Sequence, residues 1–130
     1  MTYLLDTNAC IRYLNGWSEK IRLRLEATDP QDIVVCSVVK AELSYGAAKS
    51  KNPTENLEKQ QRFLDRFTSL PFDDRAAEAY GRIRARLETA GTLIGPNDLL
   101  IAAIAVANEV TLVTHNTREF SRVEGLILED

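Results

Sequence analysis

Short apolar runs alternate along the chain with longer stretches in which apolar residues recur every three or four positions. Short runs of branched aliphatic residues between turn residues are typical of buried strands, and the wider spacing is typical of helices that bury one side. The pattern predicts strands at 2–5, 33–36, 70–72, 110–113 and 126–128. It predicts helices at 7–15, 18–27, 38–48, 55–68, 74–90 and 96–107, and a loop or helical turn at 115–121.

The alternation of strands and helices determines the fold class. Strands separated by helices form a parallel sheet with helices on both faces. The sequence therefore predicts an α/β fold, a three-layer α/β/α sandwich around a short, mostly parallel sheet. A length of 130 residues suits a single domain spanning 1–130. In such folds ligands bind beyond the carboxyl ends of the strands, so candidate chemistry is expected at that edge.

Three carboxylates are expected to meet at this edge. Asp6 directly follows the first predicted strand, Glu42 lies about one turn into the helix after the second, and Asp98 lies in the first turn of a helix beginning at Pro96. Each has an ordinary explanation on its own. Asp6 can cap a helix, Asp98 can complement a helix dipole, and Glu42 can be an exposed helix residue.

Taken together, the three carboxylates predict a site for Mg²⁺ or Mn²⁺. Carboxylate oxygens are the ligands these ions prefer, and the ion offsets the repulsion between neighbouring acids. One ion or a pair of ions at such a site activates a water and stabilises a phosphodiester undergoing in-line hydrolysis. We therefore expect a metal-dependent nuclease.

Other catalytic classes lack the residues they need. The single histidine, His115, excludes a two-histidine ribonuclease mechanism, and no glycine-rich phosphate loop is present. Cys10 and Cys36 have neither CxxC spacing nor a catalytic partner, and we expect both to be reduced and buried.

Charge limits how the chain can bind a nucleic acid. The net charge is −3 and the isoelectric point is about 5.2, so no globally positive surface is available. Binding must then use metal ions and a local basic rim, for which Arg118 and Arg122 are the candidates because they follow the fourth predicted strand. The first residues lack a secretion signal and the apolar run 99–107 is too short to span a bilayer, so we expect a cytoplasmic protein.

Four stretches, in this order and spacing, resemble the PIN-domain ribonucleases and in particular the VapC toxins of bacterial type II toxin–antitoxin systems. They are YLLDTN at 3–8, SVVKAELSYGAAKS at 37–50, GTLIGPNDLLIAAIA at 91–105 and LVTHNTREFSRVEGL at 112–126. The resemblance covers essentially the whole chain. It implies a translation-inhibiting endoribonuclease that cuts a transfer RNA or ribosomal RNA site with Mg²⁺, for which Mn²⁺ substitutes.

The resemblance also implies roles for individual residues. Asp6, Glu42 and Asp98 match the family's metal-binding catalytic acids. Asn116 falls where many PIN domains carry a fourth acid, and Glu119, three residues later, is the candidate to supply that carboxylate. The polar residues implied to line the site in support are Thr7, Asn8 and Ser37.

The implied partners are a cognate antitoxin protein, an RNA substrate and a second copy of the chain in a homodimer. Family antitoxins insert a basic segment into the acidic crevice, which suits a chain of this charge. Three alternatives stay open: an RNA-processing PIN nuclease without a toxin role, a non-catalytic module that binds RNA or protein, and a haloacid-dehalogenase-like phosphatase. The last needs D-x-D where this chain has D-T-N.

Overall fold

The computed structural model describes residues 1–130. Its strands are β1 (Tyr3–Leu5), β2 (Ile33–Cys36), β3 (Thr68–Leu70), β4 (Thr111–Val113) and β5 (Ile127–Glu129). Its helices are α1 (Thr7–Leu14), α2 (Glu19–Glu26), α3 (Ser37–Ala48), α4 (Pro53–Leu64), α5 (Asp74–Thr89), α6 (Pro96–Ala107) and α7 (Thr117–Phe120), with a 3-10 turn, η1, at Pro30–Asp32.

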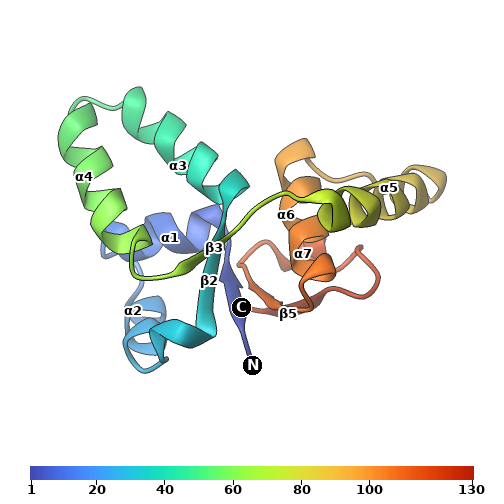
Figure 1. Ribbon diagram of the computed structural model, residues 1–130, viewed down its shortest axis with the longest axis horizontal. Coiled ribbons are helices and arrows are strands. Elements are labelled where there is room, and N and C mark those ends of the chain that lie inside the picture. Colours follow the sequence, from blue (N-terminus) through green and yellow to red (C-terminus); the bar gives the residue numbers. More distant parts are fainter.

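The five strands form one sheet in the order β3-β2-β1-β4-β5, and every pairing is parallel. The chain first builds outward from β1 to β2 and β3, then returns to add β4 and β5 on the other side of β1. Helices α1 to α4 lie on one side of the sheet and α5 to α7 on the other (Figure 1). The predicted α/β/α fold class is therefore confirmed, and the sheet is parallel throughout.

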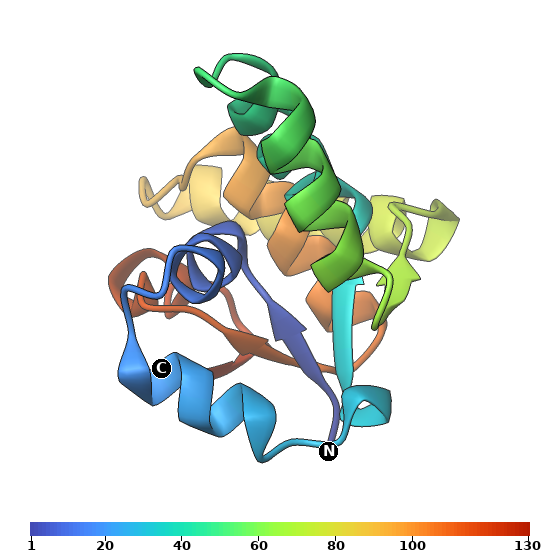
Figure 2. The same ribbon diagram turned by 90° about the vertical axis from the view of Figure 1, so that its left-hand side faces the viewer.

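The side view shows the layers that bury the core. Helices α1, α2 and α4 lie in front of the strands and α6 lies behind them (Figure 2). Leu4 of β1 and Leu112 of β4 are paired in register and fully buried. Five consecutive residues of α6, Ile101 to Ala105, are at most 1% exposed, because this helix lies between the sheet and α5. None of the helices is both long and apolar enough to cross a lipid bilayer.

Two of the predicted strands and long helices differ from the structure by more than one residue at an end. Helix α4 begins at Pro53, where the fixed φ of proline suits the first helical position, and ends at Leu64, well before residue 68. Strand β3 covers Thr68–Leu70 rather than 70–72, because its register pairs Val34 with Thr68. Pro71 follows at once and has no N–H to continue the ladder.

Helix α3 begins at Ser37, one residue before the predicted start at residue 38. The N-cap of that helix is Cys36, whose backbone is extended. No side chain caps this helix end. The strand thus passes into the helix without an intervening loop, which brings Glu42 close to the carboxyl edge of the sheet.

Substituting Leu4 by alanine should lower the free energy of unfolding by roughly 2–5 kcal/mol, because a fully buried leucine leaves a cavity at the centre of the sheet. Urea denaturation measures the change. The control is Leu23→Ala on α2, where the side chain is 53% exposed and the expected change is within about 0.5 kcal/mol. Equal losses at the two positions would contradict this placement of the core.

Candidate active site

The reversal of strand order next to β1 positions the candidate site. Asp6 follows β1 and Thr114 follows β4, and these two strands are neighbours in the sheet. The Asp6 backbone N–H still bonds the Val113 carbonyl, at 3.1 Å, so the two strand ends are held side by side. A reversal of this kind opens a crevice between the helices that leave the sheet on opposite faces.

Asp6 is a buried carboxylate at the base of this crevice. It is 5% exposed, and its Oδ1 accepts the backbone N–H of Ala9 at 2.8 Å, which caps α1. Burial raises the pKa of Asp6, and the neighbouring Thr114 hydroxyl and the Ala9 N–H lower it in part. Glu42 also raises that pKa, which places the two carboxylates within electrostatic reach.

Glu42 is tied to the start of α1. The Thr7 hydroxyl donates a hydrogen bond of 2.6 Å to Glu42 Oε1. Thr7 is the first residue of α1 and Glu42 lies in the second turn of α3, so this bond joins the two helices that leave β1 and β2. Thr7, which was expected to support the site, therefore orients Glu42.

Asp98 and Glu119 form a carboxyl pair across the crevice. Asp98 lies in the first turn of α6, and burial raises its pKa to about 7, with further contributions from a hydrogen bond to Glu119 and from the charges of Glu119, Glu42 and Asp6. Asn116 donates from Nδ2 to Glu119 Oε2 at 2.9 Å. Asn116 therefore positions Glu119, and the two residues act together at this point.

No basic side chain neutralises these acids. None of the ion pairs in the structure involves Asp6, Glu42, Asp98 or Glu119. A cluster of carboxylates without a cation fits the oxygen ligands of a hard divalent ion. The side chains do not, however, form a ready-made chelate of three such groups in this structure.

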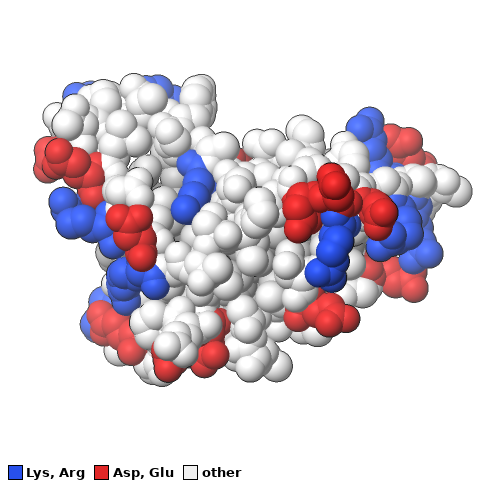
Figure 3. Space-filling model, viewed as in Figure 1, with Lys and Arg blue, Asp and Glu red and all other residues white.

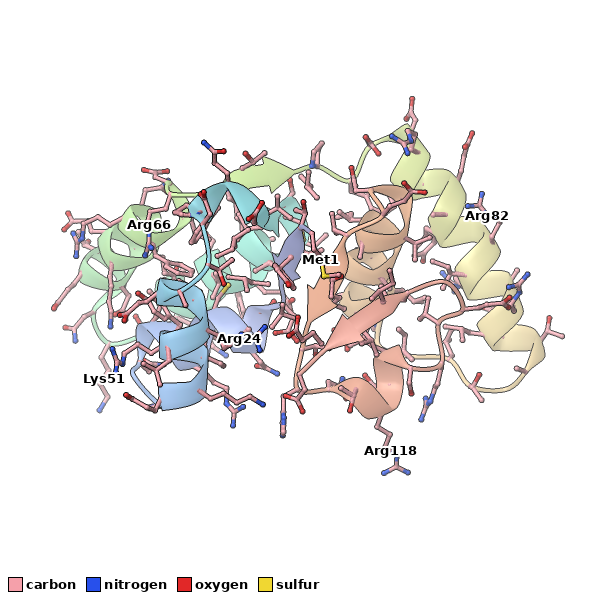
Figure 4. All side chains as sticks on the ribbon, turned by 90° about the horizontal axis from the view of Figure 1, so that it is seen from below. Met1, Arg24, Lys51, Arg66, Arg82 and Arg118 are labelled. Carbon is pink, nitrogen blue, oxygen red and sulfur yellow. The ribbon has the colours of Figure 1, made fainter.

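The remaining predicted residues make no side-chain hydrogen bond or ion pair with the four acids. Asn8 and Ser37 are exposed and make no side-chain hydrogen bond. Arg118 extends from α7 away from the body of the molecule (Figure 4), and Arg122 reaches only the Leu93 carbonyl, at 3.4 Å. His115 is exposed and pairs with Asp130 at 3.1 Å.

Thr114 follows the fourth strand at the expected edge, but the sequence alone assigned it no role in the site. It is 1% exposed, and its Oγ1 accepts the Asn116 N–H at 2.9 Å while the hydroxyl also lies beside Asp6. A polar residue directly after a buried strand was the available signal. Without the strand order, nothing in the sequence places that strand next to β1.

Charge on the surface is mixed. On the face in Figure 3, Lys and Arg side chains are interspersed with Asp and Glu at the two ends of the molecule, and the middle carries few of either. A separate hollow of about 250 Å³ lies between α2 and strands β1, β4 and β5. It is lined by both members of the Arg24–Glu129 ion pair and contains none of the site carboxylates.

The family model described as PIN domain matches residues 3–126 of this chain. Ribonuclease VapC2 of Rickettsia felis is 42% identical to it over 131 residues, and the tRNA(fMet)-specific endonuclease VapC of Salmonella typhimurium is 38% identical over 130 residues. Both alignments cover 100% of this chain and 98% of the relative. The chain belongs to the VapC group of PIN-domain ribonucleases.

Solved structures of VapC proteins have the same fold over the same length. The VapBC2 complex of Rickettsia felis, bound to a DNA fragment from its promoter, matches with a TM-score of 0.92 and covers 99% of this chain and 98% of that one. The DNA-bound VapBC complex of Salmonella typhimurium matches with a TM-score of 0.94, covering 100% and 98% at 38% identity. The resemblance inferred from the sequence is confirmed, and PIN-domain nucleases generally depend on divalent metal ions.

The raised pKa of Asp98 predicts that the stability of this VapC protein, kept metal-free by EDTA, decreases as the pH rises. The pKa of this carboxyl rises from 3.8 to about 7 on folding, so between these values the folded chain holds a proton that the unfolded chain has lost. Stability therefore falls as pH rises through this window. Asp98→Asn should remove the fall and raise the free energy of unfolding at pH 8 by on the order of 1 kcal/mol.

Chemical denaturation between about pH 4 and pH 8 measures this effect. Asp74→Asn is the matched control, because Asp74 is an exposed acid in the first turn of α5. A gain at position 98 that is the same at both pH values would show that ionisation of this carboxyl does not cause it.

Proposed function

We propose that this chain is the toxin of a type II toxin–antitoxin pair, and that it inhibits translation by cutting initiator transfer RNA. As a VapC protein it is an endoribonuclease whose partner is a cognate antitoxin. The observation that carries the proposal is the crevice in which Asp6, Glu42, Asp98 and Glu119 gather without a neutralising base. The transfer RNA target is supported by the relatives named tRNA(fMet)-specific endonuclease, at 38% and 39% identity.

In this proposal Asp6, Glu42 and Asp98 hold Mg²⁺, with Mn²⁺ able to replace it, and Glu119 completes the acidic set. When bound, the ion supplies charge that stabilises the phosphate oxygens and lowers the pKa of a water. Water adds to phosphorus and the bond to the 3′ oxygen breaks, which leaves a 3′-hydroxyl and a 5′-phosphate.

The protein's own contribution is to position the acids. Thr7 orients Glu42, Asn116 orients Glu119, and Thr114 and the Ala9 N–H hold the Asp6 carboxylate in one direction. Because these interactions exist before substrate arrives, little reorganisation is needed when a phosphodiester binds. Asn116 carries no charge, so its role is to aim Glu119 rather than to add a fourth acid of its own.

The antitoxin is proposed to neutralise this crevice with a basic segment. An acidic crevice on a chain of isoelectric point about 5.2 attracts such a segment and an ion by the same electrostatics. A second copy of the chain is proposed to complete a toxin dimer within the complex.

Replacing Asp6 by asparagine should abolish growth arrest and RNA cleavage, because the charge at the base of the crevice is lost while asparagine still caps α1. The measurement is induced expression of the original chain and the variant in a bacterial host, with new 5′ ends mapped in total RNA. Cuts in initiator transfer RNA from the original chain alone are expected. Excess EDTA should stop cleavage in vitro, and added Mg²⁺ or Mn²⁺ should restore it.

Cleavage that persists in EDTA, or a 2′,3′-cyclic phosphate product, would contradict the metal-dependent mechanism. Discrete cuts without growth arrest would favour an RNA-processing nuclease. No cuts from a folded chain free of antitoxin would favour a binding module.

Arg118 and Arg122 are proposed to bind the RNA backbone, since both are exposed and neither pairs with an acid. Replacing both with alanine should weaken RNA binding and lower the slope of log affinity against log salt by about 0.7–0.9 for each phosphate that is no longer neutralised. Binding of the Asp6→Asn chain to labelled RNA over a salt series measures the slope. Arg82→Ala on α5 is the control, and an equal change there would reject a local interaction.

A further inference from the structure

A hollow of about 230 Å³ opens directly beside Glu42, between helices α1, α3 and α4. Ile11, Leu14, Leu43 and Ala47 supply its apolar part. Asn56, Lys59 and Gln60 of α4 supply polar groups. Because Glu42 itself lines this space, whatever fills it lies next to the acids that are proposed to act on the phosphate.

Gly46 lines the same hollow, and the fold gives no reason for a glycine there. It lies in the interior of α3 without positive φ, and a Cβ at this position would meet nothing within 4 Å. Glycine inside a helix costs stability relative to alanine. Without a side chain at Gly46, the hollow is open at this position.

Three amide side chains line the hollow, those of Asn15, Asn56 and Gln60, and hydrogen bonds fix the orientation of the last two. The Ser50 hydroxyl donates to the Ala47 carbonyl at 2.6 Å, so it can only accept from Asn56, whose Nδ2 lies 2.8 Å away. Gln60 Nε2 donates to the Leu43 carbonyl at 3.0 Å. Both amides thus point their NH₂ groups at the protein, which leaves Asn56 Oδ1 and Gln60 Oε1 as acceptors without a partner.

We propose that this hollow is a subsite for one unstacked RNA base adjacent to the scissile phosphate, an inference that rests on the proposed ribonuclease function. A flat apolar body with amino or imino hydrogens at its edge matches apolar walls and two free acceptor oxygens. The volume lies below the roughly 300–1,000 Å³ of pockets that take drug-sized ligands, and so suits a single base.

The charged and polar lining of the hollow suits an RNA base and its phosphate. Lys59 is the only charged side chain there besides Glu42, and it is exposed and makes no ion pair. The phosphate next to a bound base would be attracted by Lys59. Single-stranded RNA is generally read in this way, base by base outside the stack.

The test fills the hollow from Gly46. Gly46→Leu adds a side chain where the structure has open space, and Gly81→Leu on α5 is the matched control, because that helical glycine also has nothing within 4 Å of its Cβ. Gly46→Ala is a smaller step in the same direction. Thermal unfolding checks that all three remain folded, and binding to the cognate antitoxin is measured for each.

Activity is measured as kcat/KM on an initiator transfer RNA transcript, and on transcripts carrying an abasic residue on one or the other side of the mapped cut. Gly46→Leu should lower kcat/KM on the intact transcript about tenfold or more, and Gly81→Leu should leave it unchanged. One of the two abasic transcripts should lower the rate of the original chain to a similar extent. That same abasic transcript should lower the rate of Gly46→Leu little further, because the leucine already excludes the base from the hollow.

Equal rates for Gly46→Leu and the original chain would overturn the base subsite while the ribonuclease function stands. Loss of antitoxin binding by Gly46→Leu with unchanged cleavage would assign the hollow to the antitoxin instead. If the original chain and Gly81→Leu both fail to cut RNA, the proposed function itself is wrong, and the subsite fails with it.

Discussion

The reversal of strand order between β1 and β4 is the constraint on which the rest of the structure depends. Strand β1 has β2 on one side and β4 on the other. The helices that follow β1 and β4 lie on opposite faces of the sheet, and the edge between them is exposed (Figure 1). Residues from the first turn of α1, the end of β4 and the start of α6 are brought together only by this order. The acidic crevice therefore exists because the strand order brings these residues together.

Burial of carboxylates at this edge, with a further contribution from repulsion between them, opposes folding. The pKa values of Asp6 and Asp98 are both raised, which means that the folded state holds their charged forms less well than water does. The cost is offset by an extensive core in which the central strands and α6 are almost wholly buried. A stable core that supports an electrostatically unfavourable edge is expected where charged groups serve chemistry rather than stability.

The sequence predicted the fold class and the strands and helices that position the acids, because those elements have strong periodicity and clear ends. Pro96 and Asn108 delimit α6 as expected, and Ile33–Cys36 is the predicted second strand. The largest errors fall on α4 and β3. Helix α4 begins at Pro53, and the bounds of β3 follow from its pairing with β2 at the edge of the sheet.

The site was predictable in part. Its three principal acids follow from strand ends and helix starts, whereas the pairing of Asn116 with Glu119 and the proximity of Thr114 to Asp6 depend on tertiary structure. The hollow at Gly46 depends on how three helices pack, and no residue spacing in the sequence predicts it.

Asp6 has two separable tasks, as a helix cap and as a buried charge. Asparagine caps a helix as well as aspartate does, but it carries no charge. The charge at the base of the crevice and the start of α1 can therefore be separated by a single isosteric replacement, which leaves the backbone of the crevice in place while changing its electrostatics.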